Sequence, residues 1–228
     1  MPILLAIAGL LVLALIFGPQ LWIRRVMAQH GGERADLPGT GGELARHLLD
    51  EADLSGVTVE LTGDGDHYDP EARAVRLTPQ HHDGRSVAAV AVAAHEVSHA
   101  VQHARGEPAF VRRFNLVRRL IWVERAASVI LLATPLVFVL VKSPALAVLQ
   151  IVAGVALLAI RIAVHAVTLP VELDASFGKA LPALTRGRYL GAGDLPAARS
   201  VLTAAALTYV AAALVALTQL IYLIASRR

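Results

Sequence analysis

The sequence lacks cysteine altogether. A disulfide framework, a thiolate nucleophile and a cysteine-ligated zinc site are therefore excluded. Any metal ion that the protein binds must be held by histidine, aspartate or glutamate side chains. The same absence leaves the redox state of the surrounding compartment undetermined.

Charged and aromatic side chains are also scarce. Charged residues make up 17% of the 228 residues and aromatic residues 5%, and the formal net charge is only +3. The arginines are scattered and are not interleaved with aromatic residues, so we expect no nucleic-acid partner. Hydrophobic residues, in contrast, make up 56% of the chain. This proportion is higher than in most soluble domains and indicates a membrane protein.

Four apolar runs account for this composition, and about 20 apolar residues in a helix cross the hydrocarbon core of a bilayer. Arg24 and Arg25 follow the first run and no basic residue precedes it. This pattern favours an uncleaved anchor over a signal peptide. Only residues 142–144 separate the second run from the third, which predicts a helical hairpin through the bilayer. The runs cover residues 3–23, 126–141, 145–167 and 201–225.

The arginines also predict an orientation. Residues 24–125 contain many arginines, whereas the turn between the second and third runs contains a single lysine. The positive-inside rule therefore places the long segment in the cytoplasm, and residues 168–200 return to the same side. The predicted division is an anchor at 1–23, a cytoplasmic catalytic segment at 24–125, a transmembrane hairpin at 126–167, a second cytoplasmic segment at 168–200 and a C-terminal transmembrane helix at 201–228.

The polar segment contains the elements of a small folded unit. Glycines at 39–42 precede a helical pattern at 43–52, and residues 57–61 and 74–78 alternate like half-buried strands. The turn-rich stretch between these strands predicts a small β-hairpin. Ser86 is a good N-cap for a helix over residues 87–103, which contain neither glycine nor proline. The predicted fold is mainly α, with about four transmembrane helices, a cytoplasmic zincin-like catalytic helix and this hairpin.

The predicted helix at 87–103 contains the run His95-Glu96-Val97-Ser98-His99. Residues four apart lie on one face of a helix, so His95 and His99 can bind one zinc ion. Glu96 then lies beside the metal, where a general base is needed to take a proton from water. His103 continues the same face but stands about 12 Å from His95 along the axis, so we reject it as a ligand.

The apolar residues 87–94 favour this site over the alternative of two solvated surface histidines. A third ligand must lie on the same side of the membrane and close to the helix. Glu172 and Asp174, which follow the third apolar run, are both candidates on this ground.

The sequence resembles the YugP-like neutral zinc metallopeptidases, a family of small bacterial membrane proteins. The resemblance implies zinc as the cofactor, His95, His99 and Glu172 as its ligands and Glu96 as the general base. It also implies peptide or protein substrates, membrane proteins among them, and a location in the bacterial cytoplasmic membrane. The arginine distribution predicts that the active site lies on the cytoplasmic side. The matching stretches are residues 66–70, 75–77, 94–103, 169–172 and 204–210.

A more distant resemblance connects the chain with the gluzincin membrane proteases of the HtpX type. In that group a Glu-x-x-Ala-Asp run begins with the third zinc ligand, and here residues 172–176 match it except at Ser176. The departure removes an acidic partner that orients a zinc-ligating histidine, and Asp174 is the predicted substitute. Candidates for stabilising the oxyanion are His67, Tyr68, Arg161 and His165.

The remaining pairs of basic residues lie outside the predicted metal site. Arg112 with Arg113, and Arg118 with Arg119, are interpreted as a basic helix that contacts anionic lipid of the bilayer. His81 and His82 are interpreted as a solvated turn. The predicted function is a membrane-embedded zinc metalloendopeptidase; the alternatives are a non-catalytic zinc-binding membrane scaffold and a metal sensor or transporter.

Overall fold

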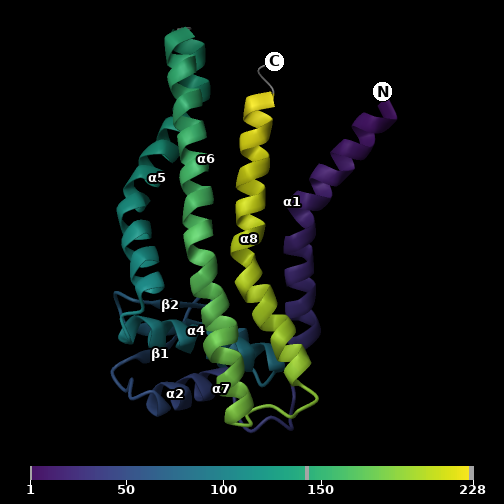
Figure 1. Cartoon of the computed structure of the whole chain (residues 1–228), viewed down its shortest axis with the longest axis vertical. Coiled ribbons are helices and arrows are strands. Elements are labelled where there is room, and N and C mark those ends of the chain that lie inside the picture. The colour runs from purple at the N-terminus through teal and green to yellow at the C-terminus, as the bar shows by residue number, and fades with distance from the viewer. Residues whose placement is uncertain (1, 142–143, 226–228) are drawn as a thin grey trace.

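The computed structural model describes residues 2–141 and 144–225. It is mainly helical and has one small sheet, as the sequence predicts (Figure 1). Four long helices stand side by side, and the short elements gather at one end of them (Figure 1). The elements are α1 (Pro2–His30), α2 (Gly41–Glu51), β1 (Thr58–Leu61), β2 (His67–Asp69), β3 (Ala74–Leu77), α3 (Pro79–His82), α4 (Val87–Ala104), α5 (Pro108–Val141), α6 (Pro144–Leu173), the π-helix η1 (Asp174–Ala180), α7 (Leu181–Arg186) and α8 (Leu195–Ala225).

The long helices include the four predicted apolar runs and extend beyond each of them. Within the described part of the chain, two segments are long and apolar enough to cross a membrane, at Val152–Arg186 and Leu195–Val215. They correspond to the third and fourth predicted spans. The first two spans, in α1 and α5, stay predictions, and residues 142 and 143 of the predicted hairpin turn lie outside the described residues.

The long helices pack in an open row in the order α5, α6, α8, α1. Helix α6 packs against both α5 and α8, and α8 packs against α1. Small side chains make this close approach possible, and Ala204, Ala206 and Ala211 of α8 are buried. Within the described residues, α1 and α5 at the two ends of the row do not pack extensively against each other.

The predicted helix at 43–52 is confirmed as α2. Thr40 accepts a hydrogen bond from the Glu43 backbone, and the Glu43 side chain accepts one from the Thr40 backbone, which completes a capping box. The preceding glycines are needed for packing. A Cβ atom at Gly41 would lie 2.2 Å from the carbonyl oxygen of His81, so α2 can approach α3 only with glycine at this position.

The prediction of a hairpin from residues 57–61 and 74–78 is wrong. Strands β1 and β3 are parallel, with Thr58 opposite Ala74, and the sheet order is β1-β3-β2. The segment that was predicted to be a turn contains strand β2, which pairs antiparallel with β3. Asp69 closes the β2–β3 turn because its carboxylate accepts hydrogen bonds from the backbone of Glu71 and Ala72. The hairpin is therefore formed by β2 and β3.

Helix α4 is the core of the folded unit, and it confirms the predicted helix at 87–103. Ser86 caps it by accepting a hydrogen bond from the Ala89 backbone. Every residue from Val87 to Ala100 is buried, because α2, the sheet, η1 and α8 all pack around this helix. Most of these side chains are alanine or valine, whose small size lets the surrounding elements come close. His95 and His99 of α4 are thereby buried.

Candidate metal centre

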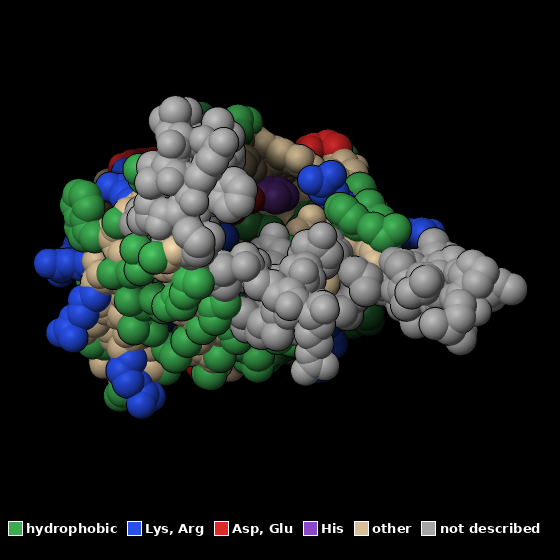
Figure 2. Space-filling view, turned by 90° about the horizontal axis from the view of Figure 1, so that it is seen from above, with side chains coloured by type: hydrophobic (Ala, Val, Ile, Leu, Met, Phe, Trp, Pro, Cys, Tyr) green, Lys and Arg blue, Asp and Glu red, His purple; other side chains and the backbone are tan. Residues whose placement is uncertain are grey.

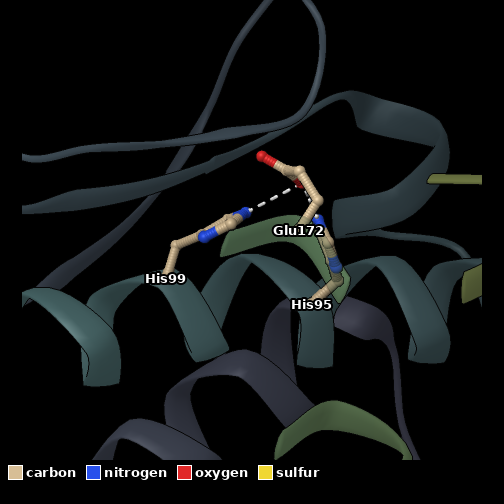
Figure 3. A group of neighbouring side chains, drawn as sticks. All are labelled: His95, His99 and Glu172. Atoms are coloured by element: carbon tan, nitrogen blue, oxygen red, sulfur yellow. Dashed lines mark hydrogen bonds and ion pairs between the residues drawn. The ribbon is translucent and has the colours of Figure 1, made fainter. Parts of the chain in front are cut away.

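Two histidines and one glutamate converge at the junction of α4 and α6. The Nε2 atom of His95 lies 3.1 Å from Oε2 of Glu172, and Nε2 of His99 lies 3.3 Å from the same oxygen. Figure 3 shows both imidazole rings projecting from α4 toward the Glu172 carboxylate. One ligand atom from each residue lies within 4.8 Å of the others. The third member of the group comes from the last turn of α6, so a long helix carries it to the histidines.

The other nitrogen of His95 is held by Ser176. The distance from Nδ1 to the serine oxygen is 3.1 Å, and the serine hydroxyl donates its single hydrogen to the Leu202 carbonyl at 3.2 Å. Because that hydrogen is used, the serine oxygen must accept from His95, and Nδ1 carries the proton. The Nε2 lone pair is then directed at the Glu172 side of the site.

The other nitrogen of His99 is held by Gln102, which the sequence analysis did not identify. Gln102 accepts from Nδ1 of His99 at 2.9 Å and donates from its amide nitrogen to the Val171 carbonyl at 3.0 Å and to Asp174 at 2.8 Å. Both amide hydrogens are used, so the amide oxygen faces His99. His99 therefore also presents Nε2 to the site, and Gln102 ties α4 to the end of α6.

The predicted role of Asp174 as the direct partner of a histidine is wrong. Its carboxylate contacts Gln102 and Lys179 and reaches His99 only through Gln102. The reason lies in η1, where seven residues form a π-helix directly after Leu173, the last residue of α6. In this segment Ser176 is fully buried beside His95, whereas Asp174 faces Lys179. Ser176, which stands where the distant relatives have aspartate, therefore lies next to His95.

This donor set fits a small divalent cation. Two imidazoles present Nε2 and one carboxylate completes a His-His-Glu set, a combination that zinc prefers. The second carboxylate oxygen of Glu172, Oε1, is buried and has no hydrogen-bond partner among the described residues. A cation at the centre of the group would bind the lone pairs of the two Nε2 atoms and of Oε2, which face one another across the site.

Glu96 lies between the two histidines in sequence and faces the same cavity. Only 7% of its surface is exposed. The pKa of its carboxyl is raised to about 7, mainly by burial. The negative charges of Glu172 and Asp66 contribute to the rise, and His95 and a backbone hydrogen bond from Tyr68 oppose it. A carboxyl group with this pKa can both accept and release a proton near neutral pH.

The cavity that contains these groups has a volume of about 320 Å³. Helices α1, α5 and α8 and strand β2 form its walls, so it lies where the folded unit meets the long helices. Arg113 is the one cationic side chain among the described residues that line it. Other lining residues are Met27, Tyr68, Phe110, Phe114 and Thr208.

Arg113 and Tyr209 form a pair in this cavity. Arg113 donates to the Tyr209 hydroxyl at 3.2 Å, and its guanidinium lies 3.6 Å from Oε1 of Glu172. The interpretation of Arg112 and Arg113 as a lipid-binding pair therefore fails for Arg113, while Arg112 is exposed. Tyr209 was not identified from the sequence, where the alanine-rich run around it indicates helix packing.

The four residues predicted as candidates for stabilising the oxyanion line two different cavities. His67 and Tyr68 of β2 line the metal cavity, whereas Arg161 and His165 line a second cavity farther along the long helices. The Tyr68 hydroxyl lies 2.9 Å from Nδ1 of His103. Burial lowers the pKa of His103. His103 thus contacts Tyr68 and is not part of the metal-binding group, as predicted.

The interpretation of His81 and His82 as a solvated turn is wrong for His81. This side chain is buried, and its Nδ1 lies 2.7 Å from the Asp66 carboxylate. Burial opposes the ionisation of Asp66, but hydrogen bonds from His81 and Thr78 outweigh it and lower the pKa of Asp66. The pair fixes the loop before β2 against α3, and Asp66 reaches the wall of the metal cavity.

The family of the chain agrees with this geometry. A family model described as "Putative neutral zinc metallopeptidase" matches residues 4–228, nearly the whole chain. The protein belongs to this family, which confirms the resemblance inferred from the motifs.

One relative is similar over almost the full length. The chain is 34% identical over 215 residues to the "Putative membrane protease YugP" of Bacillus subtilis strain 168, which covers 92% of this chain and 90% of that protein. No solved structure matches the chain.

Proposed function

We propose that this protein is a membrane-embedded zinc metallopeptidase that hydrolyses peptide bonds with Glu96 as the general base. The observation that carries the proposal is the convergence of His95, His99 and Glu172 on one point beside a buried Glu96. The family description and the name of the Bacillus subtilis relative support it.

His95, His99 and Glu172 are the proposed zinc ligands. Ser176 and Gln102 hold the two imidazoles in the tautomer that leaves Nε2 for the metal, which is the usual arrangement around metal-ligating histidines. Zinc held by these three residues would lower the pKa of a bound water and would polarise the carbonyl of a substrate.

Glu96 carries the proton transfers. Its carboxylate accepts a proton from the attacking water and then donates that proton to the amine that leaves. Burial suits Glu96 to both steps, because it keeps the pKa of the carboxyl near neutral pH rather than near 4.

Tyr209 is the proposed donor to the oxyanion that develops on the scissile carbonyl. Arg113 can only donate, so the Tyr209 oxygen is the acceptor of their hydrogen bond, and the phenol hydrogen is left to donate to another group. Tyr209 and Arg113 both line the cavity that contains Glu96 and the ligands. A phenol donor and a nearby positive charge stabilise negative charge in such a site.

Strand β2 is the proposed platform for the substrate backbone. It is an edge strand of the sheet, pairs only with β3 among the described strands, and lines the metal cavity through His67 and Tyr68. An extended peptide can add to such an edge through main-chain hydrogen bonds. The scissile bond would then lie in the cavity beside His95, Glu96 and His99 of α4.

The membrane location rests on α6 and α8, which contain segments long and apolar enough to cross a bilayer, and on the name of the relative. The arginine distribution supports a position of the site on the cytoplasmic side. Glu172 links the two parts, because it ends one of these helices and joins the histidines.

The test compares zinc binding with hydrolysis in the purified full-length protein. We expect Glu96→Gln to keep zinc and to lose cleavage of a fluorescently labelled unstructured protein, while Glu71→Gln, at an exposed position, keeps both. We expect His95→Ala and Glu172→Ala to lose zinc, measured by elemental analysis. Unchanged cleavage by Glu96→Gln would refute its role, and zinc binding without any cleavage would favour a structural zinc scaffold.

A further inference from the structure

A second cavity, with a volume of about 420 Å³, lies among the long helices. Most of its walls are apolar, with Leu120 and Ile121 of α5 and Ile160 of α6 among them. Three polar residues also line it, namely Gln20, Arg161 and His165. Apolar walls with a few polar groups are typical of a cavity that binds a ligand.

The two cavities share the side chain of Val117, so they follow one another along α5. The α5 residues that line them run from Phe110 to Ile121. At 1.5 Å per residue this distance is about 16 Å, which holds about five residues of an extended peptide at 3.3 Å each. A chain in the second cavity would therefore lead directly to the metal centre.

Both cavities lie on the side where the row of long helices is open. Residues of α1 and α5 face each other across them, with Met27 and Phe110 in the first and Gln20 and Ile121 in the second. These two helices are the ends of the row and do not pack extensively against each other in the described part of the chain. Seen from the far end of the long helices, a histidine side chain is visible in a hollow of the surface (Figure 2).

We propose that the substrate is a membrane-anchored polypeptide whose apolar segment passes between α1 and α5 into the second cavity. This inference rests on the proposed peptidase function and names its substrate class. The continuity of the second cavity with the metal cavity favours a polypeptide over a hydrocarbon chain, because only a polypeptide would bring a peptide bond to the proposed catalytic site. The cleavage site then lies within about five residues of the apolar segment.

The first experiment uses two substrates with the same cleavable sequence, incubated with the zinc-loaded enzyme in liposomes. One substrate carries an apolar transmembrane segment three residues from the cleavable sequence, and the other lacks it. We expect the anchored substrate to be cleaved faster. A third substrate, with a spacer of about 15 residues before the anchor, exceeds the length of the two cavities and should lose this advantage.

The second experiment locates the apolar segment in the enzyme. A photo-crosslinking amino acid replaces Ile121, or Leu120 in a second variant, in an enzyme that also carries Glu96→Gln to prevent turnover. The control position is Leu149, which is 62% exposed on α6 and lines neither cavity. We expect crosslinks from Ile121 and Leu120 to the anchored substrate and none from Leu149.

The outcomes separate this inference from the function on which it rests. Equal cleavage of all three substrates, or crosslinks from Ile121 and Leu120 to lipid alone, would overturn the proposed path and leave the peptidase intact. Failure of the zinc-loaded enzyme to cleave any of them would overturn the peptidase function and, with it, this inference.

Discussion

Gln102→Met is the substitution that tests the metal centre most directly. Methionine has nearly the volume and flexibility of glutamine but makes none of its hydrogen bonds. Gln102 is 1% exposed, so water cannot replace the lost partners. The variant leaves Nδ1–H of His99 and the Val171 carbonyl without this partner, while Asp174 keeps its contact with Lys179.

The magnitude follows from these losses. Each buried group deprived of its partner costs roughly 1–3 kcal/mol, so we expect the free energy of unfolding to fall by about 2–6 kcal/mol. His99 also loses the bond that orients it, which weakens zinc binding by about 10–100-fold. Zinc affinity is measured by competition with a chromophoric chelator, and stability by thermal unfolding of the metal-free protein.

Two comparisons make the result specific. Gln29→Met places the same side chain at an exposed position of α1 and should change neither quantity. Gln102→Glu keeps an acceptor for His99 but loses the donors to Val171 and Asp174, so it should bind zinc more tightly than Gln102→Met. Zinc affinity of Gln102→Met within about twofold of the parent protein would refute the orienting role of Gln102.

Three further outcomes follow from the site. Tyr209→Phe should lower kcat about 100-fold with unchanged zinc content, as expected for loss of an oxyanion donor; an equal change in KM alone would contradict that role. Ser176→Ala removes the acceptor for His95 and should weaken zinc binding about tenfold in the chelator competition; unchanged affinity would show that His95 needs no such partner. Asp66→Asn removes a negative charge that raises the pKa of Glu96. The acid limb of kcat/KM should therefore move to lower pH, because the base stays ionised further into acid, and a shift to higher pH would contradict this sign.

The catalytic helix could be predicted because its signals are local. Ser86 caps α4 one residue before the helix begins, and the spacing of His95 and His99 requires only helical periodicity to place both on one face. Glu172 was chosen on family resemblance, since position along the chain left it equal to Asp174. The apolar runs similarly predicted the long helices, although their sequences could not show where each helix ends.

The elements that were missed depend on contacts between distant segments. Tyr209 comes close to Arg113 only because α8 and α5 face the same cavity, and no spacing relates the two residues. Strand β2 has three residues, too few for a pattern of alternation, and exists because β3 pairs with it. Gln102 did carry a signal, since it lies three residues after His99 and therefore on nearly the same face of the helix.

The position of Glu172 at the end of α6 has a mechanical consequence. Helix α6 has 30 residues, so it is a rod about 45 Å long with the third metal ligand at one tip. A tilt of about 5° around its middle moves that tip by about 2 Å, ten times the tolerance of about 0.2 Å for a ligand distance at a metal site. The metal centre can therefore stay intact only while α6 keeps its angle relative to α4. The hydrogen bond from Gln102 of α4 to the carbonyl of Val171, one residue before Glu172, holds the end of α6 in place.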